Sequence, residues 1–141
     1  MQGLTTKIYE YLPKEALLLR EEVFLGEQGF TIEKDAIDDI ATHIVIYDGD
    51  VAVGVARLYY DNGFIVGRIC VRQGFRGQGI GGILLFEAEK IVRDRKGDSI
   101  RLHAQLRAKE FYERYGYISY GDIEYEEWCE HIWMDRDLKK R

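Results

Sequence analysis

A glycine-rich segment between a predicted strand and a predicted helix constrains this chain more than any other feature. Residues 72–81 read RQGFRGQGIG, follow the apolar run 64–71 and open a helix-like stretch over 80–95. A glycine-rich turn at the start of a helix points unobstructed backbone N–H groups and the positive end of the helix dipole at one place. Arg72 and Arg76 add positive charge there. The segment, with Gly82, predicts an anion cradle for phosphate or pyrophosphate, and residues 72–82 are called the cradle below.

Two known phosphate-binding patterns match the cradle only superficially. A P-loop needs Lys and Ser or Thr where Ile80 and Gly81 stand. The spacing Gly77-x-Gly79-x-x-Gly82 matches a dinucleotide fingerprint, but five residues separate it from the preceding strand. The next predicted strand also lacks an acidic residue at its far end for a ribose hydroxyl. A nicotinamide-dependent enzyme is therefore only a minor alternative.

A third pattern accounts for the cradle and for distant parts of the chain. Arg76-Gly-Gln-Gly-Ile-Gly81 resembles the Arg/Gln-x-x-Gly-x-Gly/Ala acetyl-CoA loop of the GNAT superfamily of N-acetyltransferases. Ala108-x-x-Phe-Tyr-x-x-x-Gly-Tyr117 resembles the family segment A-x-x-F-Y-x-x-x-G-[FY]. Residues 20–28 (R-x-x-V-F-x-x-E-Q), 102–105 (LHAQ) and 131–134 (H-x-x-M) resemble the ElaA-like subgroup.

This resemblance implies a fold and a co-substrate. The fold is an α+β domain over 1–141, with a mixed, mostly antiparallel central sheet flanked by helices and with its fourth and fifth strands parallel and splayed. Acetyl-CoA is the implied co-substrate, and no metal is expected. The residues expected to contact it are Ile69, Cys70, Val71, Arg76, Gly77, Gln78, Gly79, Ile80, Gly81, Gly82, Phe111 and Tyr112.

Hydrophobic periodicity predicts the same order of elements without the resemblance. Helices are expected after Pro13 (with Ala16, Leu19, Val23 and Phe24 at helical spacing), over 80–95 and over 107–115. Strands are expected at 4–11, 42–47, 51–59, 64–71, 99–104, 117–124 and 130–137. A helical crossover between the fourth and fifth strands predicts that these two run parallel.

Length and composition narrow the class of protein. A chain of 141 residues that is 46% hydrophobic and 32% charged fits one compact domain. No apolar run has the ~20 residues that a membrane span needs, and no leader is recognised, which predicts a cytoplasmic protein away from membranes. Cys70 and Cys129 are too few and too far apart for a disulfide framework or a zinc site. Cys70 is expected to be a small buried hydrophobe.

Charge is unevenly distributed along the chain. Residues 68–109 hold ten Lys or Arg against four Asp or Glu, whereas 1–67 hold five against twelve. Residues 110–141 hold five against nine. The basic stretch coincides with the cradle, as a polyanionic cofactor favours. The acidic remainder argues against nucleic acid and mildly favours a cationic amine, although a solvated acidic surface is an equally good interpretation.

In the resembled family, acetyl transfer assigns a role to Tyr112. Its position is that of the family tyrosine that protonates the departing thiolate, and a backbone N–H near Ile69–Val71 is the expected oxyanion donor. Two plainer alternatives are open for Tyr112. It is a packing aromatic, or its hydroxyl only binds the cofactor.

The general base is left open by the sequence. Many relatives carry a glutamate on the fourth strand, where this chain has Val66-Gly-Arg68. The candidate bases are Glu27, His103, Glu126, His131 and water. The expected acceptor-binding residues are Phe24, Glu27, Gln28, His103 and His131.

Several side chains have two interpretations. Arg57 is expected to point outward to solvent. Phe24, Tyr59 and Trp133 form either an aromatic pocket wall or, for at least two of them, buried core. The overall expectation is an acetyl-CoA-dependent N-acetyltransferase that works through a ternary complex on a small-molecule or peptide amine. A catalytically weak acyl-CoA-binding module is the alternative, and a homodimer is kept among the partner expectations.

Overall fold

The computed structural model describes residues 3–31 and 34–139 of the chain. Two compact units make up the fold, and each is assembled from separate segments of sequence. The first unit contains Met1–Tyr59 and Val66–Ala88, and the second contains Tyr60–Ile65 and Glu89–Arg141. The anion cradle belongs to the first unit, whereas Tyr112 and the candidate histidines belong to the second.

Seven strands of the described chain form a mixed sheet in the order β1-β2-β3-β4-β5-β7-β6. β4 and β5 pair in parallel through Phe64–Ile100 and Ile65–Arg101, which confirms the predicted parallel pair. The β1–β2, β2–β3, β5–β7 and β6–β7 pairs are antiparallel. The strands are β1 (Leu4–Tyr9), β2 (Thr42–Asp48), β3 (Val51–Tyr60), β4 (Phe64–Val71), β5 (Ser99–Gln105), β6 (Ile118–Glu126) and β7 (Cys129–Asp137).

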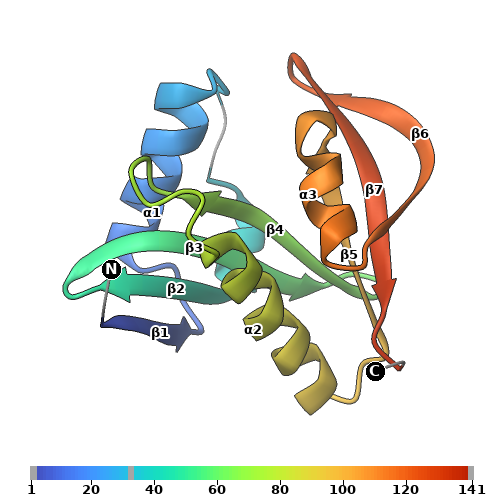
Figure 1. Cartoon of the computed structure of the whole chain (residues 1–141), viewed down its shortest axis with the longest axis horizontal. Helices are drawn as coiled ribbons and strands as arrows, with labels where there is room; N and C mark the ends of the chain where they lie inside the picture. The colour runs from blue at the N-terminus through green and yellow to red at the C-terminus, as the bar shows by residue number, and fades with distance from the viewer. Residues whose placement is uncertain (1–2, 32–33, 140–141) are drawn as a thin grey trace. The chain divides into compact units, whose positions relative to one another are not determined.

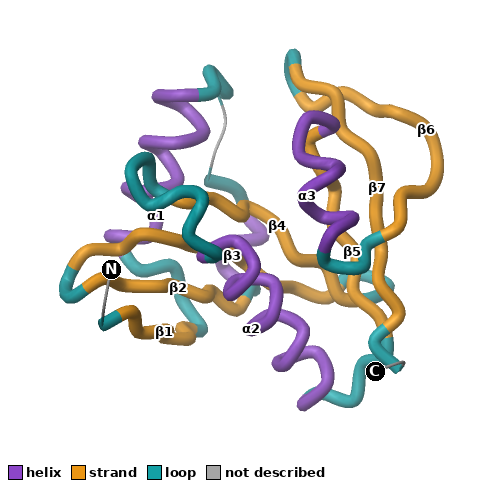
Figure 2. Tube along the Cα trace, viewed as in Figure 1, coloured by secondary structure: helices purple, strands orange, loops and turns teal. Residues whose placement is uncertain are grey.

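The helices follow the predicted order, apart from a change of helix type within the first one and the additional short helix η2. They are α1 (Lys14–Arg20), the π-helix η1 (Glu21–Glu27), the 3₁₀-helix η2 (Ala36–Asp39), α2 (Ile80–Asp94), the 3₁₀-helix η3 (Leu106–Ala108) and α3 (Lys109–Arg114). The helix expected after Pro13 changes to π geometry at Glu21, and the helical trace continues into η1 (Figure 2). Hydrophobic spacing does not distinguish the two helix types, because both bury one face of the same stretch.

In the first unit, α1 and the start of α2 cover opposite faces of the strands (Figure 1). Ala16, Leu19 and Val23 pack in one buried cluster with side chains of β2 and β3, including Val55. The neighbouring Gly54 faces the other way, since a Cβ placed on it would lie 2.6 Å from Ile80 Cγ2 and 3.4 Å from Leu84 Cδ1. Gly54 therefore lets the first turn of α2, which ends the cradle, lie directly on β3.

The second unit is built on β5, β7 and β6, and α3 contacts β5 and β6 (Figure 1). A buried carboxylate fixes the end of α2 within this unit. Glu89 accepts hydrogen bonds of 2.7 Å from the Tyr117 hydroxyl and of 2.7 Å from Arg136 Nη1. Burial, followed by the nearby Glu89 charge, raises the pKa of Tyr117, so this hydroxyl keeps its proton.

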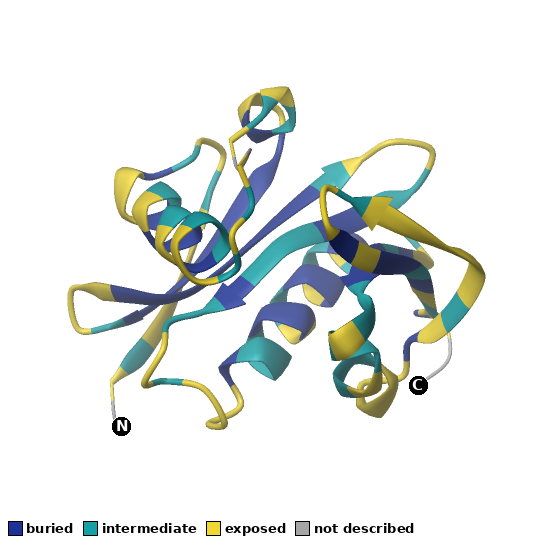
Figure 3. Cartoon of the chain, turned by 90° about the horizontal axis from the view of Figure 1, so that it is seen from above, coloured by how far each residue is buried: buried dark blue, intermediate teal, exposed yellow. Residues whose placement is uncertain are grey.

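Figure 3 shows strands that are largely buried and helices that carry both buried and exposed residues. Burial corrects the expectation for Arg57 and refines the one for the aromatic residues. Arg57 is 4% exposed instead of facing solvent, because its guanidinium is paired with the buried carboxylate of Asp38. Phe24, Tyr59 and Trp133 are each partly buried, so none is a fully enclosed core residue. Cys70 is 5% exposed within the α1 cluster, which confirms it as a buried hydrophobe.

Candidate active site

The cradle has a shape that leaves room for an anion. Gly74, Gly77 and Gly79 all have positive φ, of 94°, 76° and 84°. A Cβ placed on any of them would meet no atom within 4 Å, so space lies open in front of this backbone. An L side chain at these positions would be strained and would also fill that space.

The beginning of α2 adds hydrogen-bond donors to the same segment. Ile83 N–H donates to Gly79 O at 3.1 Å, and the N–H groups before it belong to the first turn, which has no preceding helical carbonyls to bind. Ile80 is 1% exposed, with its side chain against Gly54, so this first turn is held in place. The arrangement fits a phosphate group bound through main-chain donors.

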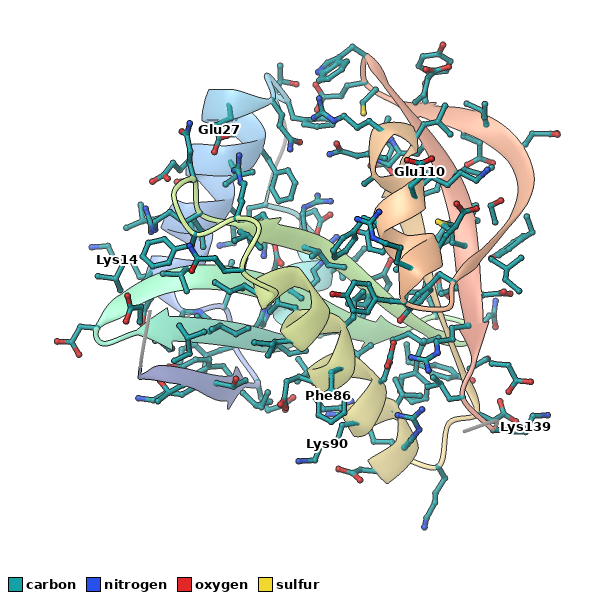
Figure 4. The ribbon with its side chains drawn as sticks, viewed as in Figure 1. Lys14, Glu27, Phe86, Lys90, Glu110 and Lys139 are labelled. Carbon is teal, nitrogen blue, oxygen red and sulfur yellow. The ribbon has the colours of Figure 1, made fainter. Side chains whose placement is uncertain are left out.

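Both arginines of the cradle form ion pairs within the first unit. Arg72 Nη1 donates to Glu22 Oε1 at 2.8 Å, and Arg76 Nη2 donates to Glu27 Oε1 at 2.8 Å. Glu27 projects from the last turn of η1 (Figure 4). The sequence predicted positive charge beside the anion site, but it gave no sign that this charge is paired with carboxylates.

Tyr112 lies on α3 in the second unit, and its ring is partly buried. Phe111 contacts it edge to face, with 5.1 Å between ring centroids. Glu110, on the same short helix, is labelled in Figure 4. Phe111 and Tyr112 are therefore held on one element, as the A-x-x-F-Y pattern requires.

The two candidate histidines meet on the β5–β7 pair. The His103 and His131 ring centroids are 5.0 Å apart, and His103 also stacks on Trp133 at 4.5 Å and 24°. His103 Nδ1 contacts a carboxylate oxygen of Glu126, while its Nε2 lies 3.3 Å from Glu124 Oε1. His103 and His131 are thus brought together with the candidate base Glu126 and with Trp133, one of the aromatic residues named from the sequence, whereas Glu124 was not predicted.

The place of Glu124 beside the histidines depends on the strand register. Glu124 pairs with His131 across β6 and β7, and His103 pairs with Trp133 across β5 and β7. The register shifts between Tyr120 and Glu124, and this irregularity decides which β6 side chains reach the histidines. Gly121 lies within the shifted stretch with φ of 74°, and an isolated glycine in a strand is the local sequence signal of such an irregularity.

A buried ion network in the first unit was also not predicted. Asp38 is 1% exposed and accepts two hydrogen bonds from Arg20, at 2.8 and 3.0 Å. Arg57 Nη1 donates to Asp38 at 3.1 Å and to Asp35 at 2.6 Å, and Arg68 Nη2 donates to Asp35 at 3.2 Å. Burial raises the pKa of Asp38, but Arg20, the Asp35 backbone N–H and Arg57 together lower it to about 2. Asp38 is therefore a structural anion and not a proton carrier near neutral pH.

The network holds a strained residue in β4. Arg68 has φ of 50°, an uncommon value for a residue other than glycine, and it directly precedes the predicted oxyanion donors Ile69–Val71. Its contact with Asp35 ties the irregular backbone of β4 to Arg57. Arg68 is therefore an anchored residue of β4.

The described residues hold no group of three or more His, Cys, Asp or Glu side chains arranged for a metal ion. Among the described helices, none has the length and apolar character of a membrane-spanning segment.

Residues 18–138 match the family model described as an acetyltransferase (GNAT) domain. The chain belongs to the GNAT acetyltransferase family. Among curated relatives, the uncharacterized N-acetyltransferase YjcF of Bacillus subtilis is 36% identical over 128 residues, covering 89% of this chain and 91% of that protein. The protein ElaA of Escherichia coli is 27% identical over 130 residues, covering 86% and 85%.

Solved structures agree with the GNAT assignment. An acyl-CoA N-acyltransferase from Pseudomonas aeruginosa superposes with a TM-score of 0.84 at 26% identity, covering 95% of this chain and 99% of that one. Escherichia coli ElaA superposes with a TM-score of 0.83 at 23% identity, covering 96% and 100%, and shows the shared fold. The resemblance to ElaA noted in the sequence is thereby confirmed.

The two units divide the candidate residues of this GNAT protein. Ile69–Val71, the cradle and the acceptor candidates Phe24, Glu27 and Gln28 lie in the first unit. Phe111, Tyr112, His103 and His131 lie in the second.

Proposed function

We propose that this GNAT protein transfers the acetyl group of acetyl-CoA to a primary amine of a small molecule or peptide, through a ternary complex. The observation that carries the proposal is the open cradle, in which three glycines with positive φ and the first turn of α2 present main-chain donors. Membership of the GNAT family supports acetyl-CoA as the ligand of that cradle.

Three segments are proposed to hold the co-substrate: the cradle, the end of β4 and α3. Backbone amides over 76–82 bind the pyrophosphate, and Gly79 leaves the space that the phosphates occupy. The backbone of Ile69–Val71 binds the pantetheine arm, while Phe111 and Tyr112 contact the cofactor from α3. Acetyl-CoA supplies the activated acyl group as a thioester.

Tyr112 is the proposed catalytic acid. The neutral amine attacks the thioester carbonyl carbon, and a backbone N–H of Ile69–Val71 donates to the oxygen as negative charge develops on it. When the carbon–sulfur bond breaks, the Tyr112 hydroxyl donates its proton to the thiolate. The attacking amine loses one proton to a base or to water, and the Tyr112 phenolate takes up one proton from water, so the reaction balances.

The acceptor is proposed to contact Phe24, Glu27, Gln28, His103 and His131. Among the candidate bases, His103 has the most developed surroundings, because the Glu126 carboxylate contacts Nδ1 and the Trp133 ring fixes the plane of the imidazole. A carboxylate partner of this kind orients a histidine ring and selects its tautomer. The carboxylates of Glu124 and Glu126 favour an acceptor that carries positive charge before it loses a proton.

A catalytically weak acyl-CoA-binding module is the second candidate. It is favoured by one observation: Val66, Gly67 and an anchored Arg68 occupy the part of β4 where the family resemblance leads us to expect a glutamate. The cytoplasmic location, the single-domain organisation and a homodimer stay predictions.

Calorimetric titration with acetyl-CoA, with NAD as the competing ligand, tests the cradle, and a thiol-release screen over primary amines tests the chemistry. The proposal expects binding of acetyl-CoA but not of NAD, followed by amine-dependent thiol release. Binding without release on any amine would favour the module. Binding of NAD and not acetyl-CoA would point to the nicotinamide alternative.

A further inference from the structure

The two arginines of the cradle make the same double contact. Arg72 donates from Nε to Ala52 O at 2.9 Å and from Nη1 to Glu22 Oε1 at 2.8 Å. Its guanidinium thus joins a carbonyl of β3 to a carboxylate of η1. The backbone N–H of Arg72 also donates to Val53 O at 2.8 Å, which fixes the beginning of the cradle to β3.

Arg76 repeats this pattern in the middle of the cradle. Its Nε donates to Val71 O at 2.9 Å, and its Nη2 donates to Glu27 Oε1 at 2.8 Å. The Arg76 guanidinium therefore connects the last residue of β4 with the last residue of η1. Neither arginine is an unattached charge that waits for phosphate, because each is already bonded at Nε and at one Nη.

The π-helix explains why both carboxylates can reach the cradle. Glu22 and Glu27 are five positions apart, a spacing that an α-helix of 3.6 residues per turn would place on different faces. A π-helix closes i to i+5 hydrogen bonds, such as Gln28 N–H to Val23 O at 3.0 Å, and so brings residues five apart to one side. Seven residues of π-helix are rare, and such segments occur at functional sites.

We infer that Glu22 and Glu27 are positioning residues for the cofactor cradle, held in line by η1 and acting through Arg72 and Arg76. The two bridges fix the cradle at its beginning and its middle before the ligand arrives. The ligand named here, CoA, rests on the proposed function. Electrostatics alone would predict that acidic residues weaken the binding of a polyanion such as CoA. Glu22 and Glu27 instead increase the affinity for CoA.

The direction of the change in CoA affinity on removing these carboxylates distinguishes positioning from simple electrostatic competition. Glu22 and Glu27 are 47% and 29% exposed in their side chains, so each pair contributes at most about 1 kcal/mol, or about fivefold in affinity. If the carboxylates only competed with phosphate for the arginines, their removal would tighten CoA binding. If they position the cradle, their removal weakens it.

Calorimetric titration of CoA into Glu22→Gln and Glu27→Gln reads this sign directly and needs no accepted amine. We expect Kd to rise about threefold in each variant, with the melting temperature unchanged. Glu21→Gln is the matched control, because it removes the same charge from the same helix but neither bridge, and its Kd should equal that of the wild type. Glu22 is the more decisive position, since Glu27 is also an acceptor candidate.

Arg76→Lys completes the test. Lysine keeps the positive charge but cannot bond Val71 O and Glu27 in the same planar geometry. We expect Arg76→Lys to weaken CoA binding, and Glu27→Gln added to it to cause little further loss, because both changes remove one bridge. Unchanged or tighter CoA binding in Glu22→Gln and Glu27→Gln would overturn the inference alone. Absence of CoA binding by the wild type would overturn the proposed function and the inference with it.

Discussion

The rings of Tyr112 and Tyr117 meet edge to face, with centroids 6.2 Å apart and planes at 69°. Both lie in the segment 108–117 that resembles the family pattern, but their hydroxyl groups have different surroundings. The Tyr117 hydroxyl is buried against Glu89, whereas Tyr112 lies on α3 with its ring partly buried. This pair allows catalysis and stability to be tested with the same substitution at neighbouring positions.

Tyr112→Phe should lower kcat by roughly 10²-fold, because it removes the proposed proton donor and keeps the ring. The Kd for CoA and the melting temperature should hardly change. Steady-state kinetics with any accepted amine checks this. A kcat within a few-fold of wild type would reassign Tyr112 to packing, and a raised Kd with normal kcat would reassign its hydroxyl to cofactor binding.

Tyr117→Phe should give the opposite result. The loss of a hydrogen bond to a buried carboxylate should lower the free energy of unfolding by about 2 kcal/mol, while kcat at saturating substrate stays near that of the wild type. Urea unfolding followed by circular dichroism measures the first quantity. Equal stability of the variant and the wild type would show that the Glu89 contact contributes nothing net.

Gly79→Val should abolish CoA binding in a folded protein. The valine places a side chain in the open space of the cradle, and its positive φ costs about 1–2 kcal/mol. Gly49→Val in the β2–β3 turn is the matched control, since Gly49 also has positive φ and no atom within 4 Å of a placed Cβ. Both variants should lose similar stability, and only Gly79→Val should lose CoA. Normal CoA affinity in folded Gly79→Val would remove the cradle from the binding site.

Acid should unfold the first unit in part through Asp38. Because its pKa is lowered from the ordinary 3.8 to about 2 in the folded chain, the ionised carboxylate contributes about 2 kcal/mol at neutral pH. This contribution is present above pH 3.8 and is lost as the pH falls through 2. Carbon-13 NMR of the Asp38 carboxyl group measures the midpoint in the folded protein. A midpoint at or above 3.8 would contradict the role assigned to Arg20 and Arg57.

The sequence predicted the elements and the glycine-rich turn before α2 well, because both depend on local signals, while anion binding by that turn stays a prediction. Glycine spacing identified the cradle, and the crossover helix between residues 71 and 99 predicted the parallel β4–β5 pair, which the structure confirms. Side chains whose partners are distant in sequence were harder to place. Arg57 was predicted to face solvent, because the sequence does not show that Asp38 of η2 lies next to it and accepts its hydrogen bond.

The same limit explains what was missed around the cradle and the histidines. The change from α- to π-helix at Glu21 turns Glu22 and Glu27 toward Arg72 and Arg76, and no spacing rule for regular helices anticipates it. The shifted β6 register sets Glu124 opposite His131 in a similar way. Electrostatic pairing across such irregularities is decided by the assembled fold and not by neighbouring residues.

The central claim is that the chain transfers acetyl groups from acetyl-CoA to amines. Mass spectrometry of a primary-amine panel, incubated with deuterium-labelled acetyl-CoA and the wild-type protein, tests it most directly, with Tyr112→Phe as the matched reaction. We predict at least one amine that gains the labelled acetyl group with equal release of CoA, and roughly 10²-fold slower product formation with Tyr112→Phe. Tight binding of acetyl-CoA with no labelled amine above the rate without protein would contradict the claim.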